Sequence, residues 1–420
     1  MIFPFENDSK IASLDWLGEG LAELSFERLG EQGLNVISRQ DRLAALDKVG
    51  LPASARISHA TMVKVAVEAD ADEIVFGRFI SDGKLVTLEA QVLHTSPPGL
   101  SPIHVESGSV QDLISSDSRL SLQLLCALEQ RDCSRPAANA EQAGASEALL
   151  PTMAALESFV RGILATDDDQ RLGALRESAR LEPSWDRPPF ELGQIYFAKR
   201  DCESALTWFS RVPPNRPDGP EASFDNGVCH LLRNDATRAV AAFAGLIDRA
   251  KSADPGDRLP DLSEVRNNLG VAYLRLAKWS DAAAEFERAT VLDNEEPDYW
   301  VNLGITKLAA KQPAAAITPL EKARNLDPAD SGIGPLVAAT LQLLGRDVEA
   351  AAIPLGSAAD SAAGHIPSPV PQDPAALARL ARISMRFDRS LLIPAGDASP
   401  AETTRKSEVV PDRKDNGSGR

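Results

Sequence analysis

Small residues recur along the second half of this chain at a nearly fixed interval. Gly193, Gly227, Gly270, Gly304 and Ala338 are separated by 34, 43, 34 and 34 residues. A period of this length is typical of helical solenoids, in which each repeated unit packs only on its neighbours. The interval therefore predicts a stack of repeats in this half of the chain, and such stacks present an extended binding surface.

Two further columns keep the same register. The second column holds small residues, Ala205, Ala239, Ala282, Ala316 and Ala350, and the third column holds larger apolar ones, Phe209, Phe243, Phe286 and Leu320. A pair of antiparallel helices explains both columns, because two helices approach closely only where a side chain is absent or is a single methyl group. The larger residue then fills the seam between the two helices. The interval of 43 leaves room for one insertion.

Some units carry a fuller signature. Leu-Gly-x-x-Tyr is intact at Leu192, Gly193, Tyr196 and at Leu269, Gly270, Tyr273, and the most complete copy holds Trp300, Leu303, Gly304, Ala316, Leu320, Ala323 and Pro328. These positions resemble the tetratricopeptide repeat (TPR). The resemblance implies an all-α solenoid of about six helical-hairpin repeats over residues 148–365.

Residues 1–130 have a different pattern, in which strand-like and helix-like segments alternate. We expect strands at 2–5, 34–38, 73–79, 85–93 and 103–105, and helices at 13–32, 40–46, 59–69 and 110–129. The turn Asp82-Gly83 lies between two alternating apolar runs and predicts a hairpin. This part is expected to form an α/β or α+β domain of ordinary size.

Four segments of this first domain, 3–7, 14–21, 36–39 and 71–77, resemble the TolB-N-like domain. In bacteria that domain occurs ahead of such repeats and, in related form, in envelope proteins. The resemblance implies a fold and a bacterial source but supplies no catalytic residue. Gly18 and Gly20 fall inside a predicted helix, where each costs about 1 kcal/mol relative to alanine. We therefore expect a strand or the Trp16 ring to approach closely there.

Three segments lie outside the two domains. Residues 131–147 are rich in small and polar residues without an apolar period, and are predicted to be a linker. Residues 373–392 begin with a helix-capping Asp373 and Pro374, so we expect a helix that caps the array. Its apolar face would hold Leu377, Leu380, Ile383 and Phe387. Residues 394–420 have almost no apolar side chains and are predicted to be disordered.

Composition limits the partners. The chain has 61 acidic and 44 basic residues, a net charge of −17, which repels phosphate backbones and excludes nucleic acid as the expected partner. It favours partners with basic or apolar surface. No apolar run reaches the ~20 residues that cross a bilayer. Because the chain leads directly into the first predicted strand, we expect a cytoplasmic protein, or a periplasmic or envelope protein if an export signal precedes this start.

The sequence holds no convincing motif of catalysis, cofactor binding or metal binding. The histidines are scattered, at His59, His94, His104, His230 and His365, and phosphate-loop and nucleophile-elbow motifs are absent. Ser81 and Lys84 have the spacing of penicillin-recognising enzymes, but they lie in a predicted turn rather than on a helix. The four cysteines, Cys126, Cys133, Cys202 and Cys229, are expected to be buried or idle thiols.

The predicted binding site is the concave groove of the repeats. Residues two positions before the signature glycines are expected to face this groove; they are Glu191, Asp225, Asn268 and Asn302, with Phe190 and Phe224 beside them. Asn268 and Asn302 occupy equivalent positions of adjacent units. The TPR resemblance implies that such stacked asparagines hydrogen-bond the backbone of an extended peptide, since a carboxamide both donates and accepts.

These features predict a non-enzymatic adaptor that binds a protein or peptide partner in the groove. Two alternatives stay open. One is an assembly factor of the envelope or periplasm, and the other is a regulatory component whose first domain senses a small molecule.

Overall fold

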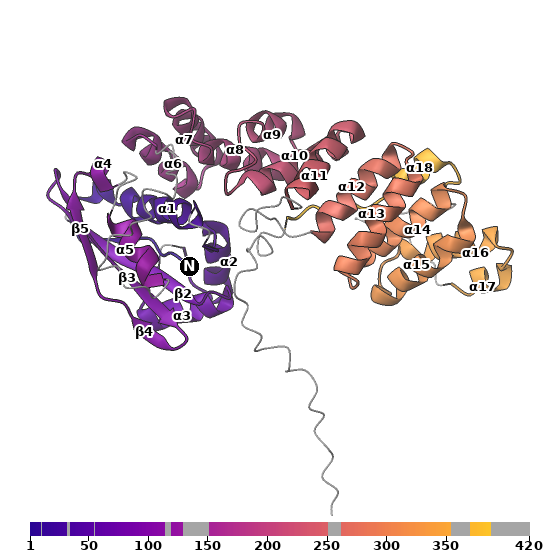
Figure 1. Cartoon of the computed structure of the whole chain (residues 1–420), viewed down its shortest axis with the longest axis horizontal. Coiled ribbons are helices and arrows are strands. Elements are labelled where there is room, and N and C mark those ends of the chain that lie inside the picture. The colour runs from indigo at the N-terminus through magenta and orange to yellow at the C-terminus, as the bar shows by residue number, and fades with distance from the viewer. Residues whose placement is uncertain are drawn as a thin grey trace, which may run out of the picture.

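A computed structural model describes residues 1–9, 11–31, 34–53, 55–113, 119–128, 151–250, 262–353 and 370–387. It contains an α/β domain followed by an all-α solenoid, as the sequence predicts (Figure 1). The predicted linker and the predicted tail lie outside the described residues.

The first domain is built around a mixed sheet. Its elements are β1 (Glu6–Asn7), η1 (Ala12–Leu14), α1 (Trp16–Glu31), α2 (Arg39–Lys48), α3 (His59–Glu68), β2 (Glu73–Ser81), β3 (Val86–Thr95), β4 (Pro98–Leu100), β5 (His104–Gly108), α4 (Val110–Leu113) and α5 (Arg119–Leu128). β1 runs parallel to β2, β2 and β3 form the predicted antiparallel hairpin, and both β4 and β5 pair with β3.

Alternation along β2 places helices on both faces of the sheet. Ile74 and Phe76 belong to a core with residues of α2 and α3. Val75 and Phe79 belong to a second core with residues of α1 and α5. The result is a sheet between two helical layers, as the period of two in a strand requires.

Two local details refine the predictions for this domain. Residues 34–38 form no strand; instead Ser38 caps α2, where its side chain accepts a hydrogen bond from the Asp41 amide. Gly18 is required by a close approach, because a Cβ there would lie 2.2 Å from the Phe5 carbonyl oxygen. The Phe5 amide in turn donates to the Gly18 carbonyl oxygen at 3.1 Å, so the chain before β1 is tied directly to α1.

The second half of the chain consists of antiparallel helix pairs that follow one another along an arc (Figure 1). The pairs are α6 (Met153–Leu164) with α7 (Asp168–Leu181), α8 (Arg187–Ala198) with α9 (Cys202–Phe209), α10 (Gly219–Leu232) with α11 (Ala236–Ala250), α12 (Ser263–Arg275) with α13 (Trp279–Leu292), α14 (Pro297–Ala309) with α15 (Pro313–Leu326), and α16 (Ile333–Leu343) with α17 (Asp347–Ala351). We call the surface formed by the first helices of these pairs the concave face.

Each signature glycine lies against the large apolar residue of the third column. A Cβ on the glycine would lie 2.4 Å from the ring of Phe209 at Gly193, 2.6 Å from Phe243 at Gly227, 2.7 Å from Phe286 at Gly270 and 2.5 Å from Leu320 at Gly304. These distances are shorter than any real Cβ contact, so glycine is what allows the two helices of a pair to meet. The alanines of the second column, Ala205, Ala239, Ala282 and Ala316, are fully buried in the same seams.

The two halves of the chain share one hydrophobic core. Leu17 and Leu21 of α1 belong to the same cluster as Phe159 of α6 and Leu192 of α8. Trp185, which precedes α8, is also in this cluster, and its indole N–H donates to Glu27 of α1 at 3.0 Å. The first helix of the α/β domain therefore packs directly on the first repeats.

A buried ionic cluster accompanies this core. Arg187 of α8 donates to Glu23 of α1 at 2.6 Å and to Asp218 at 2.8 Å, and its Nε lies 3.5 Å from Glu27. Glu191 is 3.8 Å from the same guanidinium group. One buried arginine thus faces several carboxylates. Replacing this arginine would leave buried negative charges without a partner.

The predicted capping helix over 373–392 is wrong in extent. Within the described residues 373–387 only α18 (Pro374–Ala378) is helical, and residues 381–387 belong to neither a helix nor a strand. The Asp373 cap is confirmed, since its carboxylate accepts from the Ala376 amide. The helix does not continue because the backbone of Arg382 and Ser384 is hydrogen-bonded to side chains of the solenoid.

The glycine column can be tested with a matched pair of substitutions. Gly270→Leu should lower the free energy of unfolding by about 1–3 kcal/mol or more, because the new side chain must displace Phe286. Gly245→Leu in α11 should be neutral or stabilise by about 0.5–1 kcal/mol, since nothing lies within 4 Å of its added Cβ and leucine is the better helix former. Denaturant unfolding of both variants measures the difference, and equal stability of the two would refute the steric explanation.

The interface between α1 and the repeats should depend on pH. Burial raises the pKa of Glu27 from 4.5 to about 8, although the charge of Arg187 opposes this. The folded state then holds the proton more tightly than the unfolded state, so stability falls as pH rises through this range. Glu27→Gln keeps an acceptor for Trp185 and should flatten the change in melting temperature between about pH 5 and about pH 8, the range between the unfolded and folded pKa values.

Glu157→Gln is the control, because Glu157 is an exposed carboxylate of α6 paired with Arg161. It should keep the wild-type pH dependence. A Glu27→Gln variant with the same pH slope as the wild type would show that another group governs the interface.

Candidate peptide-binding site on the concave face

The predicted asparagines bind a segment of the chain itself. We call residues 379–387, which follow α18, the C-terminal segment. Asn302 of α14 accepts from the Arg382 amide at 2.7 Å and donates to the Arg382 carbonyl oxygen at 2.7 Å. Its carboxamide therefore pairs with one residue of backbone in the way that a neighbouring strand would.

Asn268 of α12 repeats this arrangement one unit earlier. It accepts from the Ser384 amide at 2.8 Å and donates to the Ser384 carbonyl oxygen at 2.9 Å. In an extended chain, residues two apart present their backbone N–H and C=O groups to the same side. Asn268 and Asn302, at equivalent positions of adjacent repeats 34 residues apart, thus reach backbone groups two residues apart in an extended peptide.

A third asparagine connects the two pairs. Asn267 donates to the Arg382 carbonyl oxygen at 3.1 Å and to Ser384 Oγ at 3.0 Å, and it accepts from Asn302 at 2.8 Å. All three asparagines are fully buried, at 0 % exposure. Buried carboxamides are costly unless they are hydrogen-bonded. The C-terminal segment supplies the partners that these three side chains need.

The Arg382 side chain lies between two carboxylates. Its guanidinium group is 2.5 Å from Asp298 of α14 and 2.6 Å from Asp330, which precedes α16. Burial alone would lower the pKa of Arg382, but the hydrogen bonds and charges of the two aspartates raise it above the ordinary value. The site therefore recognises a cation at this position as well as an extended backbone.

Apolar contacts extend the site on both sides. The Phe387 ring lies 5.3 Å from that of Phe224 of α10, measured between centroids. On the other side, Leu377, Ala378 and Ala381 are buried in the core of the later repeats. The described part of the chain after α18 thus crosses the concave face from α14 to α10.

The remaining predicted site residues do not join this group. Glu191 faces the ionic cluster of Arg187 at the α1 interface. Asp225 is buried and accepts from Gln194 at 2.8 Å. Phe190 is part of the core around Phe209, and Phe224 packs on Phe243 as well as on Phe387. The concave row therefore divides into a stretch that contacts α1 and a stretch that binds the C-terminal segment.

Sequence reasoning missed Asn267, Asp298 and Asp330 as members of the site. A signal for the two aspartates was present, because both lie near the start of first helices in adjacent units. Their role depends on Arg382, which is 84 residues from Asp298 in sequence. Only the fold shows that these residues meet.

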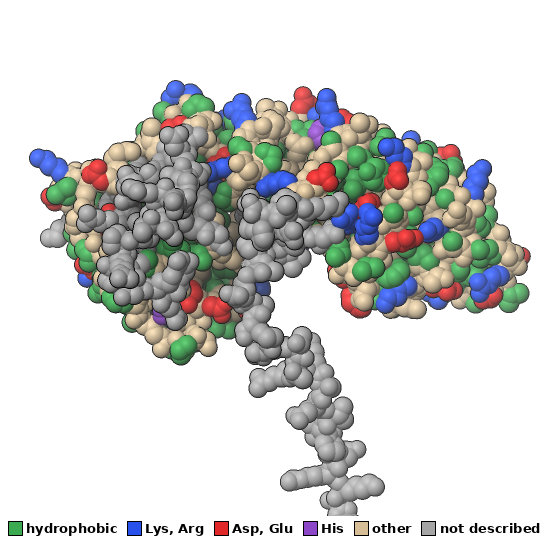
Figure 2. Space-filling model, viewed as in Figure 1, with side chains coloured by type: hydrophobic (Ala, Val, Ile, Leu, Met, Phe, Trp, Pro, Cys, Tyr) green, Lys and Arg blue, Asp and Glu red, His purple; other side chains and the backbone are tan. Residues whose placement is uncertain are grey.

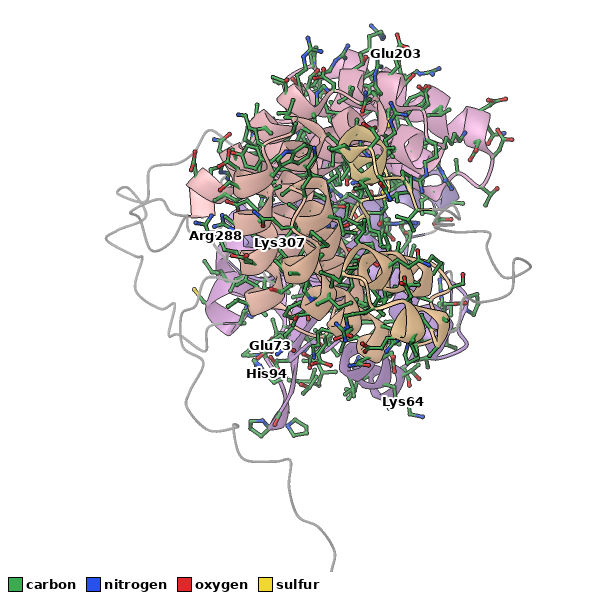
Figure 3. The ribbon with its side chains drawn as sticks, turned by 90° about the vertical axis from the view of Figure 1, so that its right-hand side faces the viewer. Lys64, Glu73, His94, Glu203, Arg288 and Lys307 are labelled. Carbon is green, nitrogen blue, oxygen red and sulfur yellow. The ribbon has the colours of Figure 1, made fainter. Side chains whose placement is uncertain are left out.

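His94, Ser81 and Lys84 lie in the β2–β3 hairpin of the α/β domain. His94 and Glu73 are cross-strand neighbours of β3 and β2, 2.6 Å apart, and lie side by side in Figure 3. Ser81 and Lys84 are in the β2–β3 turn, where Asp82 accepts from the Lys84 amide. Within the described residues no group of three His, Cys, Asp or Glu could hold a metal ion.

Two of the described cysteines are free thiols, as predicted, and one forms a disulfide bond. Cys202 and Cys229 are buried and free, as expected. Cys126 of α5, by contrast, is disulfide-bonded. Cys133 lies outside the described residues.

Comparison with known proteins supports the repeat assignment. Residues 190–257 and 267–331 match the tetratricopeptide repeat family. Over these residues the chain is similar to tetratricopeptide repeats. A search of curated proteins finds no match. The resemblance of residues 1–130 to the TolB-N-like domain stays a prediction.

Solved structures with TPR folds are similar at low sequence identity. MamA is 17% identical over 40% of this chain and 86% of that chain, with a TM-score of 0.35. MamA from Desulfovibrio magneticus RS-1, from residue 41 to its end, is 23% identical over 39% and 86%, with a TM-score of 0.34. YrrB, described as a TPR protein with an unusual peptide-binding site, is 12% identical over 43% and 88%, with a TM-score of 0.35.

Amide exchange can test the asparagine contacts. In Asn268→Ala/Asn302→Ala, residues 379–387 should exchange about 10-fold faster or more, because the backbone loses four hydrogen bonds of about 0.5–1.5 kcal/mol each. Hydrogen–deuterium exchange with mass spectrometry measures this. Asn325→Ala, an amide deletion at an exposed position of α15, should leave the exchange unchanged. Unchanged exchange in the double variant would contradict the assignment.

Proposed function

We propose that this protein is a non-enzymatic adaptor whose TPR array binds an extended segment of a partner protein on the concave face. The observation that carries the proposal is the pair of reciprocal hydrogen bonds that Asn268 and Asn302 each make with one residue of extended backbone. Backbone pairing of this kind is a recurrent mode of peptide recognition.

The charges around the asparagines favour a basic partner. Asp298 and Asp330 both face the cation of the bound segment. Elsewhere on the repeats, acidic and basic side chains are interspersed on the face shown in Figure 2. A long basic strip of the kind that binds phosphate backbones is absent from that visible, described surface, and the net charge of −17 also disfavours nucleic acid.

Two further roles each have one supporting observation. The disulfide at Cys126 favours an oxidising compartment, and so an envelope or periplasmic adaptor rather than a cytoplasmic one. None of the described helices has the length and apolar character of a membrane span. In the α/β domain a cavity of about 650 Å³, lined among others by Arg42, His59 and Gln91, is large enough for a small molecule and supports the sensing alternative.

Selection from a random peptide library on the immobilised full chain tests the proposal. Enriched peptides should contain arginine and bind the wild type in solution. Asn268→Ala/Asn302→Ala should weaken their binding about 5- to 150-fold, because the peptide backbone would lose its partners.

The control for this experiment is Asn325→Ala, which should bind the selected peptides as the wild type does. If selection yields no peptide even on Arg382→Glu, which removes the ion pairs that hold residues 379–387, or if the double variant binds the selected peptides with wild-type affinity, the concave face is not the binding site.

A further inference from the structure

We infer that the C-terminal segment is a built-in competitor that occupies the peptide site, and that a partner must present the same chemistry to displace it. This inference rests on the proposed function, because it regulates the same site. It commits to one occupant in the resting protein, residues 379–387 of the chain itself.

The contacts are those of a ligand rather than of a passive tail. Both polar backbone groups of Arg382 and of Ser384 are used by asparagines. The Arg382 side chain fills the space between two carboxylates, and the Ser384 hydroxyl accepts from Asn267. In the middle of the segment, therefore, backbone and side chains are recognised together.

The attachment of the segment makes it an effective competitor. The segment follows α18 directly, and Leu377 and Ala378 of α18 are buried in the core of the later repeats, so the segment stays close to its site. A short tether gives an effective concentration of roughly millimolar. If the segment alone bound with a dissociation constant of about 1 μM, it would weaken a partner's apparent affinity by about 1000-fold.

The contacts also define the ligand class. The partner segment must be extended and must keep backbone N–H groups at the positions of Arg382 and Ser384, which excludes proline there. It should carry arginine at the first of these positions, for Asp298 and Asp330, and a small hydroxyl residue two positions later, for Asn267. An aromatic residue three positions further would pack on Phe224, as Phe387 does. The expected pattern is Arg-x-Ser-x-x-Phe.

Competition can be measured with full-length chains and a fluorescent peptide of residues 379–387. Arg382→Glu should release the segment, because a glutamate would face two aspartates. The released chain should bind the wild-type peptide about 10-fold tighter or more than the wild-type chain does. A peptide with the same Arg382→Glu change should bind neither chain.

The matched control is Arg386→Glu, an identical charge reversal at an exposed position of the same segment. It should bind the peptide as weakly as the wild type. Should Arg382→Glu leave the segment protected from amide exchange, Arg382→Glu/Ser384→Pro, which also removes the amide that donates to Asn268, is the chain to compare. Melting curves check that each variant is folded.

Three outcomes would overturn the inference. Equal peptide affinity of the wild type and a folded, released variant would show that the segment does not compete, while the proposed function would stand. No binding of the peptide to any chain would show that the segment does not act as a ligand of the site. The proposed function would then still be tested separately by the library selection. A wild-type dimer that Arg382→Glu converts to a monomer would make the occupant the segment of a second copy.

Discussion

Hydrogen bonds between buried side chains and backbone groups hold the later repeats and the C-terminal segment together. Asn267, Asn268 and Asn302 have no exposed surface, and the backbone at 382–384 pairs with none of the strands that the structure describes. Each would be costly alone, because an unpaired buried polar group loses its hydrogen bonds to water. Together they form a closed set of hydrogen bonds. This explains why the chain leaves the helical conformation after α18: the asparagines accept and donate at the positions that a helix would need for itself.

The solenoid uses its concave face twice, once for each end of the chain. At one end α1 packs on it: Gly20 brings the Trp16 ring near Val160 of α6, and Arg187 of α8 binds Glu23 of α1. At the other end the C-terminal segment packs on α10, α12 and α14. The two contacts differ in kind. The first is a large shared hydrophobic core with a buried ionic cluster, whereas the second depends on hydrogen bonds and on the two ion pairs of Arg382, which a peptide of similar sequence could reproduce. For this reason the second contact is the exchangeable one.

The sequence predicted what is local and periodic. Glycine is needed opposite Phe209, Phe243 and Phe286 because a side chain there would clash with the ring of the paired helix. Both residues of each contact lie in one helix pair, so the recurring glycines were enough to predict the contact. The asparagines could be predicted because they share the repeat register. By contrast, Arg187 and Arg382 lie 164 and 84 residues from carboxylates that they bind, and no period relates those positions. The capping helix was overestimated because the apolar spacing of 377–387 fits a helix, while the asparagines that bind its backbone are far away in sequence.

Affinity and specificity are separated in this site, and that separation bears on regulation. The hydrogen bonds that Asn268 and Asn302 make with the C-terminal segment reach only its backbone atoms, so they discriminate little between extended segments. Discrimination comes from Asp298 and Asp330, which require a cation in one place. A tethered segment that satisfies both requirements excludes weak, non-specific peptides, because they can match its backbone contacts but not its ion pairs or its effective concentration. Only a ligand that reproduces both sets of contacts, at sufficient concentration or with additional contacts outside the segment, can exchange with it. Occupation by the chain's own residues thus raises the threshold for binding without changing the chemistry that is recognised.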